Sequence, residues 1–124
     1  MKENLLISPL GNDSLCHTWI SEKSNFDSVF LCYENLSKEN KSKYLKFTSH
    51  IYEGRGPKFQ LIKAFIESNK ELINKYKFIW LPDDDVSISV EDINTLYKTA
   101  SDFNLEIAQP SMDGYVSHNI TRPV

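Results

Sequence analysis

Short apolar runs recur along the chain, separated by longer amphipathic or polar stretches. These runs predict buried strands at 5–10, 28–33 and 78–81, the last of them as a central strand. Two further runs predict strands at 44–48 and 105–108. Strands that are apolar throughout, rather than alternating, are typical of a parallel sheet that is covered on both faces.

The stretches between the strands predict three helices. A short one is expected over 14–22, and a long amphipathic one follows Pro57, with apolar residues at spacings of three and four. A third begins after Ser89, a good N-cap residue. The polar stretch 36–43 is expected to be an irregular connection. The inward faces of the two longer helices are predicted to carry Phe59, Ile62, Phe65, Ile66, Leu72, Ile73 and Tyr76, and Ile93, Leu96, Tyr97, Ala100 and Phe103.

Alternation of strands and helices predicts one α/β domain over residues 1–124, with a mainly parallel sheet and helices on both faces. In such sheets, ligands bind beyond the carboxyl ends of the strands. Asn12, Glu34 and the segment Asp83–Asp85 each follow a predicted strand. We therefore expect these polar residues to meet at one edge of the sheet and to form the functional site.

Composition narrows the range of partners. The net charge is −3, and the chain has only two arginines, Arg55 and Arg122, so nucleic acid is not expected as a partner. No apolar run is long enough for a membrane helix, and the N-terminus does not resemble a secretory signal. Cys16 and Cys32 lie among apolar neighbours, which indicates buried, unbridged thiols. These features predict a cytoplasmic protein.

The acidic triplet Asp83–Asp85 is the most informative feature of the sequence. Three adjacent carboxylates repel one another, so they destabilise the protein unless a cation or solvent compensates them. In an extended backbone Asp83 and Asp85 share one side, and Asp84 points to the other. Two carboxylates on one side suit Mn²⁺ or Mg²⁺ shared with a ligand phosphate. The alternative is a solvated acidic turn without a ligand.

The run Phe78–Val86, FIWLPDDDV, resembles the D-x-D motif of glycosyltransferases with the A-type fold. Together with LEIAQPSMD (105–113) and SHNITR (117–122), it is similar to an uncharacterised domain family of plants and bacteria. The resemblance implies the Rossmann-like nucleotide-sugar-binding half of such an enzyme, which transfers a sugar to an acceptor hydroxyl on a glycan, lipid or protein. It implies these residues: Asp83, Asp85 and His118 for Mn²⁺ or Mg²⁺; Asn12, Glu34, Arg55, Lys58, Asp83 and Asp84 for the nucleotide sugar; and Asp113 as a catalytic candidate.

The segment Gly54–Lys58 supplies the expected phosphate contacts. It combines two glycines and two cations, Arg55 and Lys58, with the start of a helix, whose backbone N–H groups attract anions. The spacing of a P-loop is missing, because no Gly-Lys-Ser/Thr follows. An ordinary loop before a helix is the alternative interpretation. We expect Arg55 and Lys58 to lie near the acidic triplet.

The length of the chain qualifies the transferase hypothesis. Few residues follow Asp85, whereas transferases of this fold continue into an acceptor-binding half, so we expect a truncated or donor-binding half that self-associates or needs a partner domain. Two other functions fit the sequence. One is a phosphatase of the haloacid-dehalogenase type, with Asp83 as nucleophile and Asp85 as acid and base. The other is a binding module without catalysis.

Overall fold

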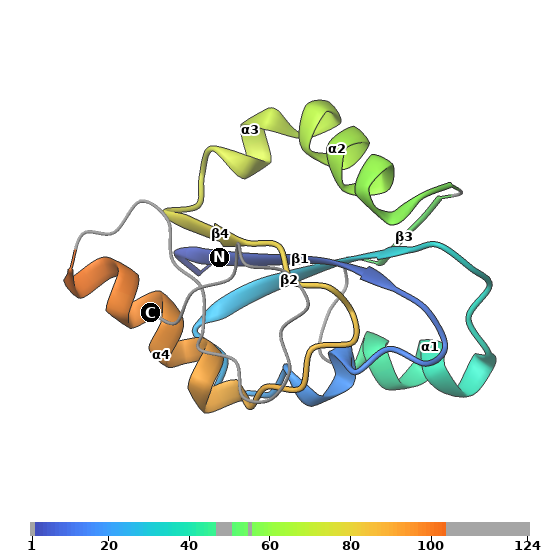
Figure 1. Ribbon diagram of the computed structural model, residues 1–124, viewed down its shortest axis with the longest axis horizontal. Coiled ribbons are helices and arrows are strands. Elements are labelled where there is room, and N and C mark those ends of the chain that lie inside the picture. The colour runs from blue at the N-terminus through green and yellow to red at the C-terminus, as the bar shows by residue number, and fades with distance from the viewer. Residues whose placement is uncertain (1, 47–50, 55, 104–124) are drawn as a thin grey trace, which may run out of the picture.

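The computed structural model describes residues 2–46, 51–54 and 56–103, and within them the chain forms a four-stranded parallel sheet (Figure 1). The order across the sheet is β3-β2-β1-β4. The strands are β1 (Asn4–Leu10), β2 (Phe26–Cys32), β3 (Ile51–Glu53) and β4 (Phe78–Trp80). All three pairings are parallel. The α/β class and the mainly parallel sheet predicted from the sequence are therefore confirmed.

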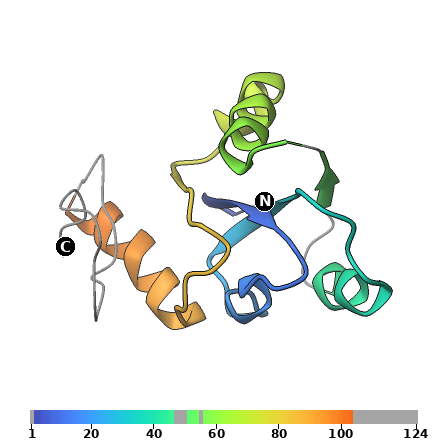
Figure 2. The same cartoon turned by 45° about the vertical axis from the view of Figure 1, so that its right-hand side comes forward.

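Helices cover both faces of this sheet (Figures 1 and 2). On one face lie η1 (Cys16–Thr18), α1 (Lys38–Leu45) and α4 (Val90–Asp102); on the other lie α2 (Lys58–Ser68) and α3 (Lys70–Ile73). Right-handed crossovers explain the division, since the chain moves one way from β1 to β3 and then steps back across the sheet to β4. None of the described helices is long and apolar enough to cross a bilayer.

The core consists of two apolar layers, one on each face of the sheet. Successive side chains of β1 point to opposite faces, so Leu6 and Leu10 join one layer and Leu5 and Ile7 the other. The first layer contains the fully buried Trp19, and α4 closes it. Burial on both faces explains why β1 is apolar almost throughout.

The prediction of an irregular connection over 36–43 is wrong, because most of this segment lies in α1. Ser37 caps this helix, since its hydroxyl accepts a hydrogen bond from the Asn40 backbone N–H at 3.2 Å. Tyr44 is the one buried residue of α1, so the segment has no apolar repeat that would indicate a helix. The strand predicted at 44–48 is also wrong, because Tyr44 and Leu45 end α1 and the strand follows at β3.

Other predicted boundaries need correction. The helix expected over 14–22 is reduced to η1, and the long helix after Pro57 divides at Asn69 into α2 and α3. The side chain of Asn69 donates to the Phe65 carbonyl at 2.8 Å, which helps to end α2 there. Phe59, predicted to face inward, is 75% exposed.

The helix predicted after Ser89 is confirmed as α4, whose first turn Ser89 caps by accepting a hydrogen bond from the Asp92 N–H. Phe103 lies just beyond its end and is exposed rather than inward. β4 was expected to be central, but within the described residues it is an outer strand, because β1 is its one partner there. The strand predicted at 105–108 lies outside the described residues.

Candidate functional site

The polar segments singled out in the sequence meet at the carboxyl edge of the sheet. Because β1, β2 and β4 run parallel, the loops that follow them begin at the same edge. The β1 loop is Gly11–Ser14, the β2 loop is Tyr33–Asn35, and the acidic loop is Asp83–Asp85. Lys58, the first residue of α2, joins them. This placement was predicted from the order of the elements.

Asp84, the middle residue of the triplet, is an internal residue that is only 4% exposed. One carboxylate oxygen, Oδ2, accepts hydrogen bonds from the Ser14 hydroxyl and, at 2.8 Å, from the Tyr33 hydroxyl. The other, Oδ1, lies 2.8 Å from the Lys58 ammonium. The resemblance implies Asp84 as a residue that binds the nucleotide sugar, but both oxygen atoms of its side chain are bonded to other residues of the protein.

These contacts set the charge states of the buried cluster. Burial by itself would raise the pKa of Asp84, but hydrogen bonds from Lys58, Ser14 and Tyr33 together hold that pKa below its ordinary value. The hydrogen bond to Asp84 raises the pKa of Lys58, which also lies over the ring of Tyr33, 4.8 Å from its centroid. The pair is therefore ionised near neutral pH, and most of its charge is compensated internally.

Backbone contacts hold the acidic loop on both sides of Asp84. The N–H of Leu15 donates to the Asp84 carbonyl at 2.7 Å, and the indole of Trp19 donates to the Val86 carbonyl at 2.8 Å. Asp83 and Asp85, which flank the buried residue, are both exposed. The sequence predicted this separation of Asp84 from its neighbours, although a turn produces it rather than an extended backbone.

Asp83 and Asp85 are the residues that could hold a metal ion. Hydrogen bonds to either side chain are absent from the described part of the chain, so their hard oxygen atoms fit Mg²⁺ or Mn²⁺, with phosphate and water completing the shell. Residues 2–46, 51–54 and 56–103 contain no group of three His, Cys, Asp or Glu side chains placed to hold a metal. His118, expected as a third ligand, lies outside the described residues, as do Asp113 and Arg55.

Glu34 and Asn12 organise the β1 loop. Glu34 Oε1 accepts a hydrogen bond from the Asn12 backbone N–H at 2.7 Å. The Asn12 side chain accepts from the Ser37 N–H at 2.9 Å and so connects the loop to the start of α1. A Cβ atom on Gly11 would overlap the Tyr33 hydroxyl and lie 2.7 Å from Glu34 Oε1, so a larger residue here would displace both side chains. Both predicted ligand-binding residues thus have internal partners.

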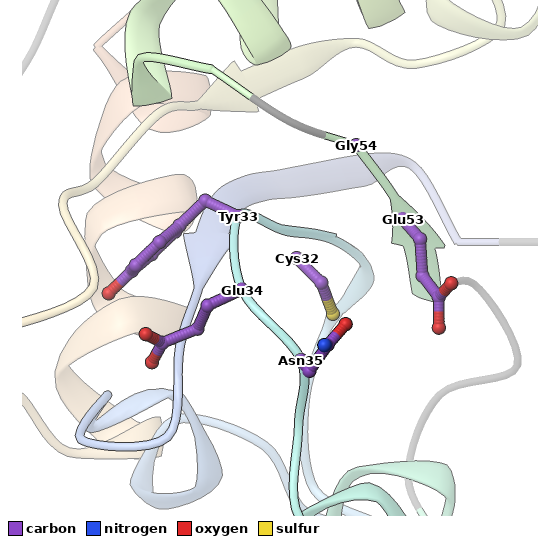
Figure 3. A pocket seen from close by; sticks show the side chains of 6 residues that line it. All are labelled: Cys32, Tyr33, Glu34, Asn35, Glu53 and Gly54. Atoms are coloured by element: carbon purple, nitrogen blue, oxygen red, sulfur yellow. The ribbon is translucent and has the colours of Figure 1, made fainter.

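A cavity of about 580 Å³ opens between the ends of β2 and β3 (Figure 3). In Figure 3 the side chains of Tyr33 and Glu34 extend away from Glu53, toward the β1 loop. The side chains of Cys32 and Asn35 lie on the same side as Glu53. Asn35 and Glu53 were not among the site residues predicted from the sequence. Glu53 ends a strand that was predicted in the wrong place, so its position at the carboxyl edge went unnoticed.

No family model, no curated protein and no solved structure matched the chain.

Proposed function

We propose that this chain is the donor-binding part of a metal-dependent glycosyltransferase, which holds a nucleotide sugar at the carboxyl edge of the sheet. One observation carries the proposal: Asp84 is fixed inside the protein, so that Asp83 and Asp85 remain exposed beside it. The strand order supports it. β2 and β3 lie on one side of β1 and β4 lies on the other, and ligands of such sheets bind where the strand order changes side.

In this proposal Asp83 and Asp85 hold Mn²⁺ or Mg²⁺ against the diphosphate of the donor. When bound, the metal neutralises charge on the leaving diphosphate. Lys58 lies beside the acidic loop with its side chain 45% exposed, so its ammonium, although paired with Asp84, can also donate a hydrogen bond to a diphosphate oxygen. Asn12 and Glu34 fix the β1 loop that borders the ligand.

The proposed transfer exchanges one bond at the anomeric carbon of the sugar. An acceptor hydroxyl forms a new C–O bond there and loses its proton to a base, while the bond to the diphosphate oxygen breaks. The acceptor is a glycan, lipid or protein. Asp113, which lies outside the described residues, stays the catalytic candidate that the resemblance implies, and no residue is assigned as the base. A donor-binding half also needs an acceptor site, which self-association or a partner domain would supply.

Titration calorimetry with UDP, GDP, ADP and CDP, with and without Mn²⁺, tests the proposal. We expect at least one to bind in a Mn²⁺-dependent way, and the double variant Asp83→Asn/Asp85→Asn to abolish that dependence. The matched control, Glu67→Gln/Glu71→Gln, removes two exposed carboxylates from α2 and α3 and should bind normally. The proposal fails if no diphosphate binds, or if the Asp83/Asp85 variant still binds in a Mn²⁺-dependent way.

A phosphorylated Asp83, mimicked with beryllium fluoride, would instead support the phosphatase hypothesis. In the structure the acidic loop follows β4, the fourth strand along the chain, whereas such phosphatases carry their aspartates after the first. The non-catalytic module predicts diphosphate binding without sugar transfer to any acceptor.

A further inference from the structure

One helix of the domain carries a concentration of positive charge that the proposed transfer does not use. Positions 38–46, which comprise α1 and the residue after it, contain one glutamate and four lysines, Lys38, Lys41, Lys43 and Lys46. Their net charge is +3, whereas the whole chain has a net charge of −3, so the other residues together carry −6. The helix α1 is therefore a basic region of an acidic protein.

Two residues of α1 face the protein and so decide which side of the helix is outward. Tyr44 is 2% exposed, and its ring packs against Phe30 with 5.7 Å between the centroids. Asn40, one turn earlier on the same side, donates a hydrogen bond from its side chain to the Asn12 side chain at 2.9 Å. In Figure 2, α1 is the last helix of its layer, at the end away from α4. These contacts fix α1 on the domain with its opposite side toward solvent.

The outward side combines lysines with one exposed leucine. Lys38, Lys41 and Leu45 lie three and four positions apart and therefore share this side. Lys46 follows Leu45 directly; all three lysines are exposed, and Leu45 is 51% exposed. Within the described residues, the one ion pair of these lysines joins Lys41 to Glu53 at 3.9 Å, and such an exposed pair contributes little. Most of the positive charge is therefore available to a partner.

Charge complementarity and the exposed leucine together favour an anionic membrane surface as that partner. Clusters of four or more lysines on a helix are attracted to anionic lipid headgroups, and each lysine near the surface adds to the attraction. An apolar side chain among the lysines can enter the boundary between headgroups and acyl chains. A nucleic-acid backbone would use the lysines but not Leu45.

We propose that the outward side of α1 docks the protein reversibly on a membrane surface rich in anionic lipids. Lys38, Lys41 and Lys46 supply the electrostatic attraction, and Leu45 makes a shallow apolar contact. Docking of this kind is peripheral, and it weakens as salt screens the charges. It goes beyond the proposed transfer and does not depend on it.

Flotation of the full chain with lipid vesicles tests the proposal. The vesicles contain phosphatidylcholine alone, or phosphatidylcholine with about one-third phosphatidylserine. We expect binding to the anionic vesicles at about 0.1 M NaCl, loss of that binding at about 0.5 M NaCl, and no binding to phosphatidylcholine alone. Neither nucleotide nor metal is present, so the result is independent of the diphosphate titrations.

Two triple variants separate the α1 surface from a general effect of charge. Lys38→Gln/Lys41→Gln/Lys46→Gln should weaken binding to the anionic vesicles at least about tenfold. The matched control removes the same charge from three exposed lysines on the side of the sheet that α2 and α3 cover: Lys63→Gln/Lys70→Gln/Lys75→Gln. We expect this control to lose less than about threefold in binding. The thermal transition of each variant shows whether it is folded.

Leu45→Ser tests the apolar contact and should weaken vesicle binding about threefold while leaving its salt dependence unchanged. No binding of the wild type to anionic vesicles, or equal losses in the two triple variants, overturns the proposal. A duplex DNA that binds as tightly as the anionic vesicles, through the same lysines and without need of Leu45, would assign the surface to nucleic acid instead.

Discussion

Lys58 and Asp84 form an ion pair, with 2.8 Å between Nζ and Oδ1, although 26 positions separate them in the sequence. The pair joins the start of α2 to the acidic loop. It is asymmetric, because the Asp84 side chain is 5% exposed and the Lys58 side chain is 45% exposed. Asp84 is thus fully committed to the interior, whereas Lys58 can still meet a second anion from solvent.

We predict that Asp84→Asn destabilises the fold by about 1–3 kcal/mol, the usual effect of disrupting hydrogen bonds to a buried charged group. An amide cannot accept from Ser14, Tyr33 and Lys58 in the same way as a carboxylate. Urea unfolding measures the change. Asp83→Asn, an exposed neighbour, is the control and should shift the free energy of unfolding by less than about 0.5 kcal/mol. Equal stability of the two variants would contradict the internal role of Asp84.

The stability of the protein should depend on Asp84 in acid. Because its pKa in the folded state lies below the ordinary value of 3.8, its stabilising contribution is complete above that value and is lost as the pH falls through the folded pKa. We expect the difference in unfolding free energy between wild type and Asp84→Asn to be constant from pH 5 to 7 and to shrink below about pH 4. A difference that grows in acid would reverse this assignment.

Lys58→Met should weaken the binding of a nucleoside diphosphate about fivefold, close to 1 kcal/mol, because it removes a half-exposed cation. Binding of the corresponding nucleoside should not change. The control is Lys63→Met, which removes an exposed cation from the same helix. Calorimetry on both variants, each shown to be folded by its thermal transition, decides the point. Similar losses for the two ligands would remove Lys58 from the phosphate contact.

The two cysteines should resist modification while the protein is folded. Burial raises the pKa of Cys16 to about 12 and that of Cys32 to about 11, and both thiols are free. We expect slow reaction with a disulfide reagent at pH 8 in native buffer and reaction of both residues in denaturant. Rapid native labelling at either position would show that its surroundings open to solvent.

Ser89→Ala should cost about 1 kcal/mol, because the Asp92 N–H at the start of α4 loses its acceptor. Ser87→Ala is the matched control, since Ser87 is exposed in the preceding loop. Chemical unfolding of the two variants gives the comparison. A loss of stability at Ser87 as large as that at Ser89 would show that the cap is not the cause.

The elements predicted correctly are those that bury several residues of one continuous segment. The strand at β1 and the helix α4 were predicted because each shows an apolar pattern that belongs to one element. Prediction failed for α1, where Tyr44 alone is buried, and for β3, a short strand whose residues are half-buried or exposed. In both segments, contacts with the rest of the domain decide the structure more than local pattern does.

The candidate site divides in the same way. The order of the elements brought Glu34, Lys58 and the acidic triplet to one edge, as the structure shows. The burial of Asp84 was not predicted, because its side-chain partners come from positions 26, 51 and 70 residues away. Alternation along the backbone separates Asp84 from Asp83 and Asp85, but it does not say which of the two sides is internal.

The position of β1 between two paired neighbours has a consequence for hydrogen exchange. Amide protons in β1 and β2 should exchange mainly through global unfolding, whereas those of β3 and β4, the short outer strands of the described sheet, should exchange through smaller local openings. The acidic loop follows β4. The metal and diphosphate contacts proposed for that loop would therefore rest on a part of the sheet that opens readily, next to the well-protected β1.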